Sequence, residues 1–240
     1  MRVRVLGAAP GGGFPLTGVL VNDDLAVDAG PLGYALPVPD LARVRDVLLT
    51  HSHLDHVAGL PVFLDAVYGF GPPPAVWGLL ATLAAVQTHL FNGVVWPDFI
   101  GMSGRLPPFL TLHPLAADKP TTVGRYMVTP LALAHAVPTV GYVVDDGRAA
   151  VAVVTDTAPV PAVFDRLAKW PRLKLVLLEA SFPDGEAELA AVSQHLTVGQ
   201  FRELAGRLPK RVTVRAIHVK PRWAAEVAAA VPVAESELEV

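Results

Sequence analysis

The amino-acid sequence predicts an α/β protein in which sheets are covered by helices. The first observation is composition: of 240 residues, 52% are hydrophobic and 17% are charged, with 23 Pro and 20 Gly, as in a compact chain with many turns. The second is that the residue pattern in the first third of the chain predicts mainly short strands. The third is that apolar strands later alternate with helical segments. A block of strands followed by such alternation favours covered sheets over a single doubly wound parallel sheet.

The elements of the first half follow from residue periodicity and turn residues. Polar and apolar residues alternate at 2–6, and the turn-forming cluster at 22–24 indicates a hairpin. Apolar residues at helical spacing from Val57 indicate a helix with Pro61 in its first turn. The predicted strands are 2–6, 18–21, 25–28, 45–49 and 75–77, and the predicted helices are 57–68 and 79–91.

The second half alternates more regularly. Proline and glycine recur through 93–124, where only a strand near 110–112 is predicted. The later strands are predicted at 126–133, 140–144, 149–154, 173–178 and 211–217, and the helices at 161–169, 186–192, 197–207 and 222–230. No repeat or linker stands out, so we expect residues 1–240 to form one domain.

Composition also excludes classes of function. The chain has no cysteine, which excludes disulfides, thiolate ligands and cysteine nucleophiles. A net charge of −3 argues against a large nucleic-acid interface, which requires clustered Lys and Arg. The N-terminus lacks a signal-peptide core, and the apolar stretch 75–97 contains Thr, Gln, His and Asn. We therefore expect a cytoplasmic protein without membrane or nucleic-acid partners.

The densest group of ionisable residues is the segment 51–56, His-Ser-His-Leu-Asp-His, directly after an apolar run. Imidazole and carboxylate are ligands for divalent ions, and His51 and His53 alternate so that both rings can reach one centre. Asp55 and His56 can then face a second centre. Packing these groups together without a counterion would carry a desolvation cost. We therefore expect two metal ions side by side, the arrangement that clamps a substrate for hydrolysis.

Four further ionisable residues follow predicted apolar strands, where layered folds gather site residues. They are His135, Asp156, Glu179 and His218. Each has an ordinary alternative, because a lone histidine is more often a surface or hydrogen-bonded core residue and Asp156 can cap a helix. Their recurrence after successive strands favours a shared site.

These residues match a known family pattern. His-x-His-x-Asp-His after an apolar strand resembles the metallo-β-lactamase superfamily, and the string 51–60 resembles the signature of class II 3′,5′-cyclic-nucleotide phosphodiesterases. Further stretches similar to that family are 88–92, 95–99, 135–138, 141–142, 179–182, 193–196 and 218–221. Gly93, Gln194 and Thr155 depart from the family's commoner residues, which affects loop geometry and removes no ligand.

The resemblance implies an αββα fold, with two facing mixed sheets, helices outside and the site along one sheet edge. It implies two divalent metal ions, Zn²⁺ in the first place, with Mn²⁺ or Fe as alternatives. One ion would be held by His51, His53 and His135, the other by Asp55, His56 and His218, with Asp156 bridging both.

The resemblance also implies the reaction: hydrolysis of cAMP or cGMP to the 5′-nucleoside monophosphate by a hydroxide that bridges the metals. Asp55, His195 and Glu179 are the candidate catalytic residues. His195 is the predicted proton donor, oriented by Glu179, because a carboxylate partner raises an imidazole pKa and fixes its tautomer. The alternative for His195 is an exposed polar residue at the start of a helix.

A substrate wall is expected around residues 70–112. His89, Asn92, Trp96 and Phe99 are its candidates, because amide and imidazole groups bind phosphate or ribose and an aromatic face stacks a base. The alternative is aromatic packing in the core of a helix and turn. A neighbouring subunit is another source for this wall, and the apolar segment 76–96 is compatible with a homodimer.

Three other functions stay open. The first is a transfer-RNA 3′-processing endonuclease or another phosphodiesterase of the superfamily. The endonuclease shares the metal set and the Glu/His pair, but requires a basic surface and usually a long protruding arm. The second is a metal-binding module without turnover. The third is a β-lactam hydrolase, although residues 88–99 resemble the phosphodiesterases more closely. Either cAMP or cGMP is compatible with these residues.

Overall fold

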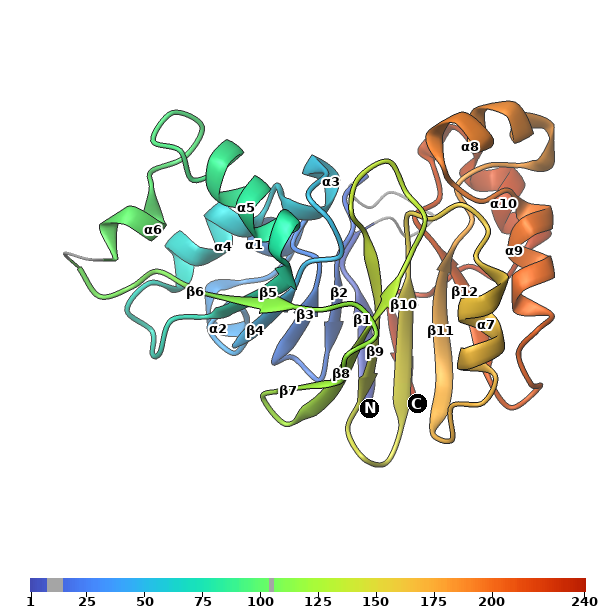
Figure 1. The fold of residues 1–240 in the computed structure, drawn as a ribbon, viewed down its shortest axis with the longest axis horizontal. Coiled ribbons are helices and arrows are strands. Elements are labelled where there is room, and N and C mark those ends of the chain that lie inside the picture. The colour runs from blue at the N-terminus through green and yellow to red at the C-terminus, as the bar shows by residue number, and fades with distance from the viewer. Residues whose placement is uncertain (8–14, 104–105) are drawn as a thin grey trace.

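Two facing sheets form the centre of the structure, a computed structural model that describes residues 1–7, 15–103 and 106–240 (Figure 1). The first sheet is mixed and has the order β13-β1-β2-β3-β4-β5-β6. Its strands are antiparallel from β13 to β3 and parallel from β3 to β6. The strands are β1 (Arg2–Val5), β2 (Val19–Val21), β3 (Leu25–Val27), β4 (Asp46–Leu48), β5 (Ala75–Leu79), β6 (Thr111–Leu115) and β13 (Glu237–Glu239).

The second sheet is also mixed, with the order β12-β11-β10-β9-β8-β7. Its pairs are parallel from β10 to β12 and antiparallel from β7 to β10. Every residue of the strand at 150–154 is buried, as expected for a strand covered on both faces. The strands are β7 (Thr121–Val123), β8 (Tyr126–Ala132), β9 (Val140–Asp145), β10 (Ala150–Val154), β11 (Leu173–Glu179) and β12 (Thr213–Ile217).

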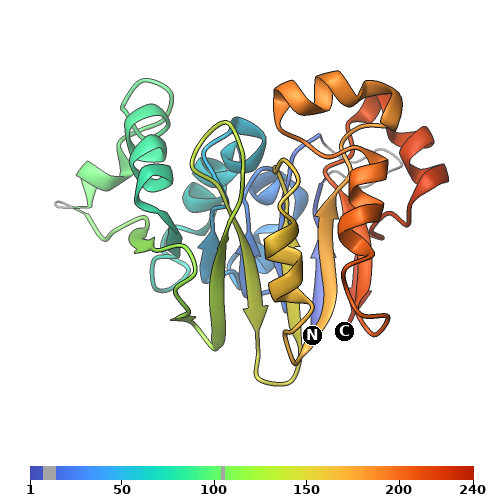
Figure 2. The same ribbon diagram turned by 45° about the vertical axis from the view of Figure 1, so that its right-hand side comes forward.

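Helices cover the outer face of each sheet. The helices of the first half are α1 (Leu32–Ala35), α2 (Val38–Leu41), α3 (Leu54–Val57), α4 (Leu60–Val67), α5 (Leu80–His89) and α6 (Phe99–Met102). Those of the second half, coloured yellow to red in Figure 2, are α7 (Pro161–Leu167), α8 (Ala187–Ser193), α9 (Val198–Ala205) and α10 (Ala224–Ala230). None of the helices in the described part of the chain combines the length and the apolarity that crossing a bilayer requires.

Three apolar layers hold this arrangement together. The central layer lies between the sheets and includes Leu48, Tyr142 and Val153. One outer layer packs helices against the first sheet around Phe63, and the other packs helices against the second sheet around Phe164. Helix, sheet, sheet and helix are therefore stacked in the predicted αββα order.

The predicted helix at 57–68 is α4, which covers Leu60–Val67, whereas Val57 is the last residue of the separate helix α3. Helix α3 ends at Val57 and α4 begins at Leu60, with Pro61 in the first turn of α4 as predicted. Gly59 stands at the break, where its amide donates to the Ala29 carbonyl at 3.0 Å. A Cβ at this position would lie 2.6 Å from that carbonyl oxygen, so the close approach of the two backbones requires glycine.

Candidate metal centre

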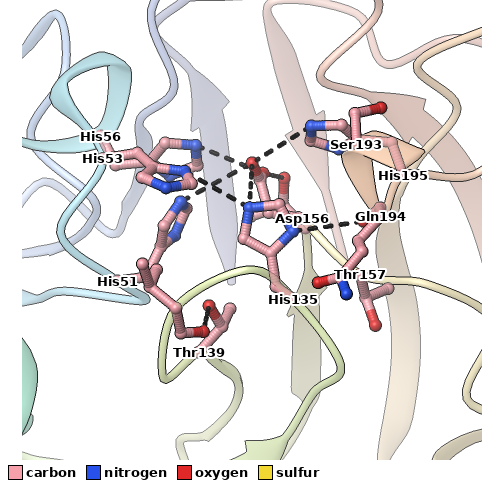
Figure 3. A network of polar contacts seen from close by, with 12 residues as sticks. His51, His53, His56, His135, Thr139, Asp156, Thr157, Ser193, Gln194 and His195 are labelled. Atoms are coloured by element: carbon pink, nitrogen blue, oxygen red, sulfur yellow. Dashed lines mark hydrogen bonds and ion pairs between the residues drawn. The ribbon is translucent and has the colours of Figure 1, made fainter. Parts of the chain in front are cut away.

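The seven predicted metal ligands lie together at the end of the sandwich where the loops after β4, β8, β10 and β12 meet. Figure 3 shows His51, His53, His56 and His135 around Asp156. The ligand atoms form two neighbouring clusters, and within each cluster they lie within 4.8 Å of one another. The first cluster contains His51, His53, His135 and Asp156; the second contains Asp55, His56 and His218.

Asp156 presents one carboxylate oxygen to each cluster. Its Oδ1 lies 3.2 Å from Nε2 of His56 and 3.4 Å from Nε2 of His218. Its Oδ2 lies 3.7 Å from Nε2 of His51 and 3.8 Å from Nε2 of His135. The side chain is 2% exposed, so this carboxylate has exchanged bulk water for imidazoles on both sides.

Most of the histidines are held from outside the clusters through Nδ1, which turns Nε2 inward. This arrangement fixes ring orientation and tautomer in metal sites. The outer contacts of Nδ1 are to Thr50 Oγ1 at 3.0 Å for His51, Asp28 Oδ2 at 2.7 Å for His56, the Gln194 carbonyl at 3.2 Å for His135 and Ser181 Oγ at 3.2 Å for His218.

Three of these residues occupy the left-handed region of backbone space. Asp28, Asp156 and His218 have φ values of 61°, 58° and 54°, and each stands directly after a strand or one residue beyond it. Most residues with a Cβ avoid this region, but Asp and His are enriched there. Such backbone strain is concentrated at functional sites, because it aims a side chain in a direction that a regular strand end would not allow.

The electrostatics of the site favour a bound cation. Burial and the neighbouring His56 lower the pKa of His51 to about 2, so its ring is neutral and has a lone pair to offer. Burial raises the pKa of Asp156, but the imidazoles of His218 and His56 outweigh burial and hold that pKa well below its usual range. Burial lowers the pKa of His56, but Asp156 and Asp28 outweigh it and raise that pKa well above the ordinary value. The carboxylates thus attract positive charge to this point.

The residues fit a metal ion by a further criterion. Among the described residues, Nε2 of His51 and Nε2 of His56 are buried without a hydrogen-bond partner. A buried polar atom without a partner is costly, and a divalent ion in each cluster, next to Asp156, would satisfy these two nitrogens. Imidazole and carboxylate donors suit Zn²⁺, Mn²⁺ and Fe²⁺.

Glu179 and His195 form a buried pair beside the clusters. Nδ1 of His195 lies 3.0 Å from Glu179 Oε2, and Nε2 of His195 lies 4.0 Å from Asp156 Oδ2. Ser181 Oγ donates to the same Glu179 oxygen at 2.6 Å, and the Leu196 amide donates to it at 3.2 Å. Glu179 therefore fixes the imidazole so that its second nitrogen faces the metal centre.

The four candidate substrate-wall residues lie in different surroundings. His89 is exposed at the end of α5, in a pocket that Ser52 and Leu54 also line. The Asn92 side chain is used within its own turn, where its Oδ1 accepts from the amides of the residues at 94 and 95, at 3.0 and 2.8 Å.

The two aromatic candidates belong to the packed layer outside the first sheet. Phe99 is 3% exposed and stacks on Phe109, with 3.9 Å between ring centroids. Trp96 is partly buried and meets Phe99 edge to face at 6.4 Å. Of the four candidates, His89 is the one that the structure places beside the predicted metal-binding segment.

Sequence reasoning did not assign a role to Asp28, Thr50, Ser181 or Lys220. Asp28 directly follows β3, whereas the sequence placed it as the last residue of a predicted strand at 25–28. Ser181 lies in the family-like stretch 179–182, but its contact with His218, like that of Thr50 with His51, depends on tertiary structure. Lys220 lines a small pocket of about 30 Å³ together with Asp55, His218 and Thr17.

An αββα sandwich with a His/Asp centre at the open end of its sheets defines the metallo-β-lactamase fold class. Residues 25–235 match the family model described as the beta-lactamase superfamily domain. The chain therefore belongs to the β-lactamase superfamily.

Comparison with individual proteins gives more detailed likenesses. The chain is 31% identical over 96 residues to 3′,5′-cyclic-nucleotide phosphodiesterase 1 of Saccharomyces cerevisiae, a match that covers 39% of this chain and 26% of the relative. The chain thus spans about a quarter of the length of that curated relative. The crystal structure of unliganded yeast PDE1 aligns with a TM-score of 0.73 at 17% identity, over 98% of both chains. Human tRNase Z, short form, aligns with a TM-score of 0.71 at 17% identity, over 100% of this chain and 99% of that chain. At these identities the two structures show the shared fold.

Proposed function

We propose that this protein is a metal-dependent phosphodiesterase that hydrolyses 3′,5′-cyclic nucleotides to 5′-nucleoside monophosphates. The observation that carries the proposal is Asp156, which divides its two oxygens between two histidine clusters while Nε2 of His195 faces the same carboxylate. Two adjacent cation sites with a proton donor beside them suit the hydrolysis of a phosphodiester. The likeness to the Saccharomyces cerevisiae cyclic-nucleotide phosphodiesterase supports the choice of substrate.

The chain's own residues would hold two divalent ions, His51, His53 and His135 on one side and Asp55, His56 and His218 on the other, with Asp156 shared. Ions bound there supply Lewis acidity toward a phosphate and activate water for attack. The Nδ1 contacts to Asp28, Thr50 and Ser181 keep the ring orientations fixed.

His195 would deliver a proton to the leaving 3′-oxygen. Its Nδ1 is tied to Glu179 at 3.0 Å, so Nε2 is the nitrogen that faces the substrate. Glu179 fixes the orientation of the imidazole, and the Leu196 amide and Ser181 hydroxyl hold the glutamate in place. An alkoxide leaving group is a strong base, and a positioned acid at this atom therefore accelerates its departure.

Lys220 would help to bind the phosphate. It lines the pocket of about 30 Å³ that also touches Asp55 and His218, a volume close to that of one water molecule. Thr17 lines the same pocket, and its buried hydroxyl has no hydrogen-bond partner among the described residues. A hydroxyl donor and a lysine beside this small space suit a phosphate oxygen.

The test is metal analysis combined with turnover. We expect about two divalent ions per chain and hydrolysis of cAMP or cGMP that a chelator abolishes and added Zn²⁺ or Mn²⁺ restores. Bis-p-nitrophenyl phosphate reports general phosphodiester cleavage in the same preparation. A fully loaded protein that cleaves bis-p-nitrophenyl phosphate and neither cyclic nucleotide would contradict the choice of substrate. A loaded protein that cleaves none of the three would favour a metal-binding module.

A transfer-RNA 3′-processing endonuclease is the second candidate, favoured by the fold shared with human tRNase Z and by the Glu179–His195 pair. The net charge of −3 counts against a polymer of phosphates as substrate. Measuring RNA affinity against salt concentration separates the two. A steep salt slope together with cleavage of a transfer-RNA precursor would replace the first proposal with the second.

A further inference from the structure

The segment that carries the predicted metal ligands has a second face. The side chains of His51, His53 and Asp55 belong to the metal clusters, and Figure 3 shows His51 and His53 directed toward Asp156. The intervening residues, Ser52 and Leu54, line a separate pocket. His53 precedes α3 with an extended backbone (φ −64°, ψ 147°), and Leu54 and Asp55 are successive residues of α3, whose side chains leave the helix about 100° apart and so can face different sides. The metal centre and this pocket are therefore separated by the thickness of a single chain segment.

Helix α5 forms the opposite wall of this pocket, which has a volume of about 240 Å³. Ala85, Val86, His89 and Leu90 contribute to that wall. Val86 and Leu90 are buried, and Leu54 and His89 are exposed, so the pocket has an apolar floor and an accessible rim. Among the described residues that line it, none is an Asp, Glu, Lys or Arg.

We propose that this pocket, here called the base pocket, binds the heterocyclic base of the nucleotide whose phosphate lies at the metal centre. The proposal rests on the proposed function and names the specificity site of the same active centre. Apolar walls match the flat faces of a base, and the Ser52 hydroxyl and His89 imidazole can pair with its polar edge. Without a charged lining, the pocket does not suit the phosphate itself.

The volume sets the size of the group that enters. Pockets that enclose a whole drug-sized ligand have volumes of roughly 300–1,000 Å³, and the base pocket, at about 240 Å³, is smaller. It therefore takes one ring system and not a complete nucleotide. The ribose would bridge the rim, leaving the phosphate on the other side of the segment that carries Ser52 and Leu54.

Binding of two products tests this assignment without relying on turnover. In zinc-loaded protein, calorimetry compares adenosine 5′-monophosphate with ribose 5-phosphate, which has the same phosphate and sugar but no base. We expect the nucleotide to bind about tenfold more tightly or better, because stacking and burial of a base contribute this much or more. Methyl NMR signals of Leu54, Val86 and Leu90 should shift with the nucleotide and stay in place with ribose 5-phosphate.

Two neighbouring alanines of α5 provide a matched pair of variants. Ala85 lines the base pocket, whereas Ala84 is exposed on the same helix. Ala85→Phe should fill the pocket and weaken nucleotide binding about tenfold or more, with ribose 5-phosphate unaffected; Ala84→Phe should change neither. If Ala85→Phe does not fold, His89→Ala compared with Thr88→Ala serves the same purpose, because both side chains are exposed.

The outcomes separate this proposal from the proposed function. Equal affinities for the two ligands in the wild type, or wild-type nucleotide affinity in Ala85→Phe, would overturn the base pocket. Base-dependent binding without hydrolysis of any cyclic nucleotide would support the pocket and refute the proposed function. Hydrolysis of cAMP with an unchanged KM in Ala85→Phe would support the proposed function and refute the base pocket. If Ala85→Phe changes the oligomeric state and leaves binding as it was, the pocket is a subunit contact and the base pocket is refuted.

Discussion

Replacing Asp28 by asparagine should weaken one metal site while leaving the fold intact. Asp28 is fully buried, and its Oδ2 lies 2.7 Å from Nδ1 of His56. Its Oδ1 accepts from the Thr50 amide at 2.8 Å, a bond that the amide oxygen of asparagine can keep. Asparagine also tolerates the left-handed backbone, which matters at a φ of 61°.

The expected magnitude follows from the tautomer of His56. In the Asp28→Asn variant the new side-chain oxygen stays paired to Thr50, so the new NH₂ group faces Nδ1 of His56 and donates to it. The ring proton then moves to Nε2, the atom that must bind the ion. Loss of such outer contacts costs about 10–100-fold in metal affinity, or about 1.4–2.8 kcal/mol. Because the contact is fully buried, we expect the upper end of this range for the ion held by His56.

Competition with a chromophoric chelator measures this affinity. The wild type should bind two ions, and Asp28→Asn should keep one tightly and lose about 100-fold at the other. Asp65→Asn is the control, because Asp65 is an exposed residue of α4. Circular dichroism spectra should be the same for all three proteins. Two tight ions in Asp28→Asn would refute the assigned role of the Asp28–His56 contact.

Three further outcomes are expected. His195→Ala should lower kcat for a cyclic nucleotide by about 10²–10⁴-fold with unchanged metal content, and bis-p-nitrophenyl phosphate, with its better leaving group, should be affected less; equal turnover of cAMP would remove His195 from the mechanism. Lys220→Gln should raise KM for cyclic nucleotides by about tenfold with a smaller change in kcat, because it removes a charge beside the phosphate; an unchanged KM would exclude phosphate binding by Lys220. Burial raises the pKa of Asp145, but hydrogen bonds from Arg172 and the Gly147 amide outweigh burial and lower that pKa. The stabilisation is therefore present above the unfolded pKa of about 3.9 and is lost as pH falls through the lower folded value. In chelator, the difference in unfolding free energy between wild type and Arg172→Ala should shrink below about pH 4, and a difference that persists there would contradict the ion-pair origin.

The sequence predicted those parts of the fold that are encoded locally. Apolar runs such as 150–154 and 173–179 are strands, as their composition indicated. The four-residue helices α1, α2, α3 and α6 were missed because they are too short to show a period. Strand β13 was missed for another reason: it pairs with β1 from the opposite end of the sequence, with Arg4 opposite Glu237.

The candidate site was likewise predicted only where the signal lies in the local sequence. The ligand candidates were visible because ionisable residues cluster at 51–56 and recur after apolar strands. The residues that hold the ligand side chains in place could not be identified from the sequence. Asp28, for example, reaches His56 only when β3 and β4 pair in parallel. The base pocket likewise depends on how α5 packs beside residues 52–54, which no local pattern records.

Each metal cluster draws on both halves of the sandwich. His51 and His53 come from the first sheet and meet His135 and Asp156 from the second; Asp55 and His56 meet His218 in the same way. Each cluster takes residues from both sheets, so an ion bound in either cluster would link the two sheets. Because such an ion would bind only when the two sheets are packed together, its binding would stabilise that packing. When metal is scarce, the two sheets should therefore separate first at the end that carries the clusters. The apolar layer between the sheets should hold the other end together.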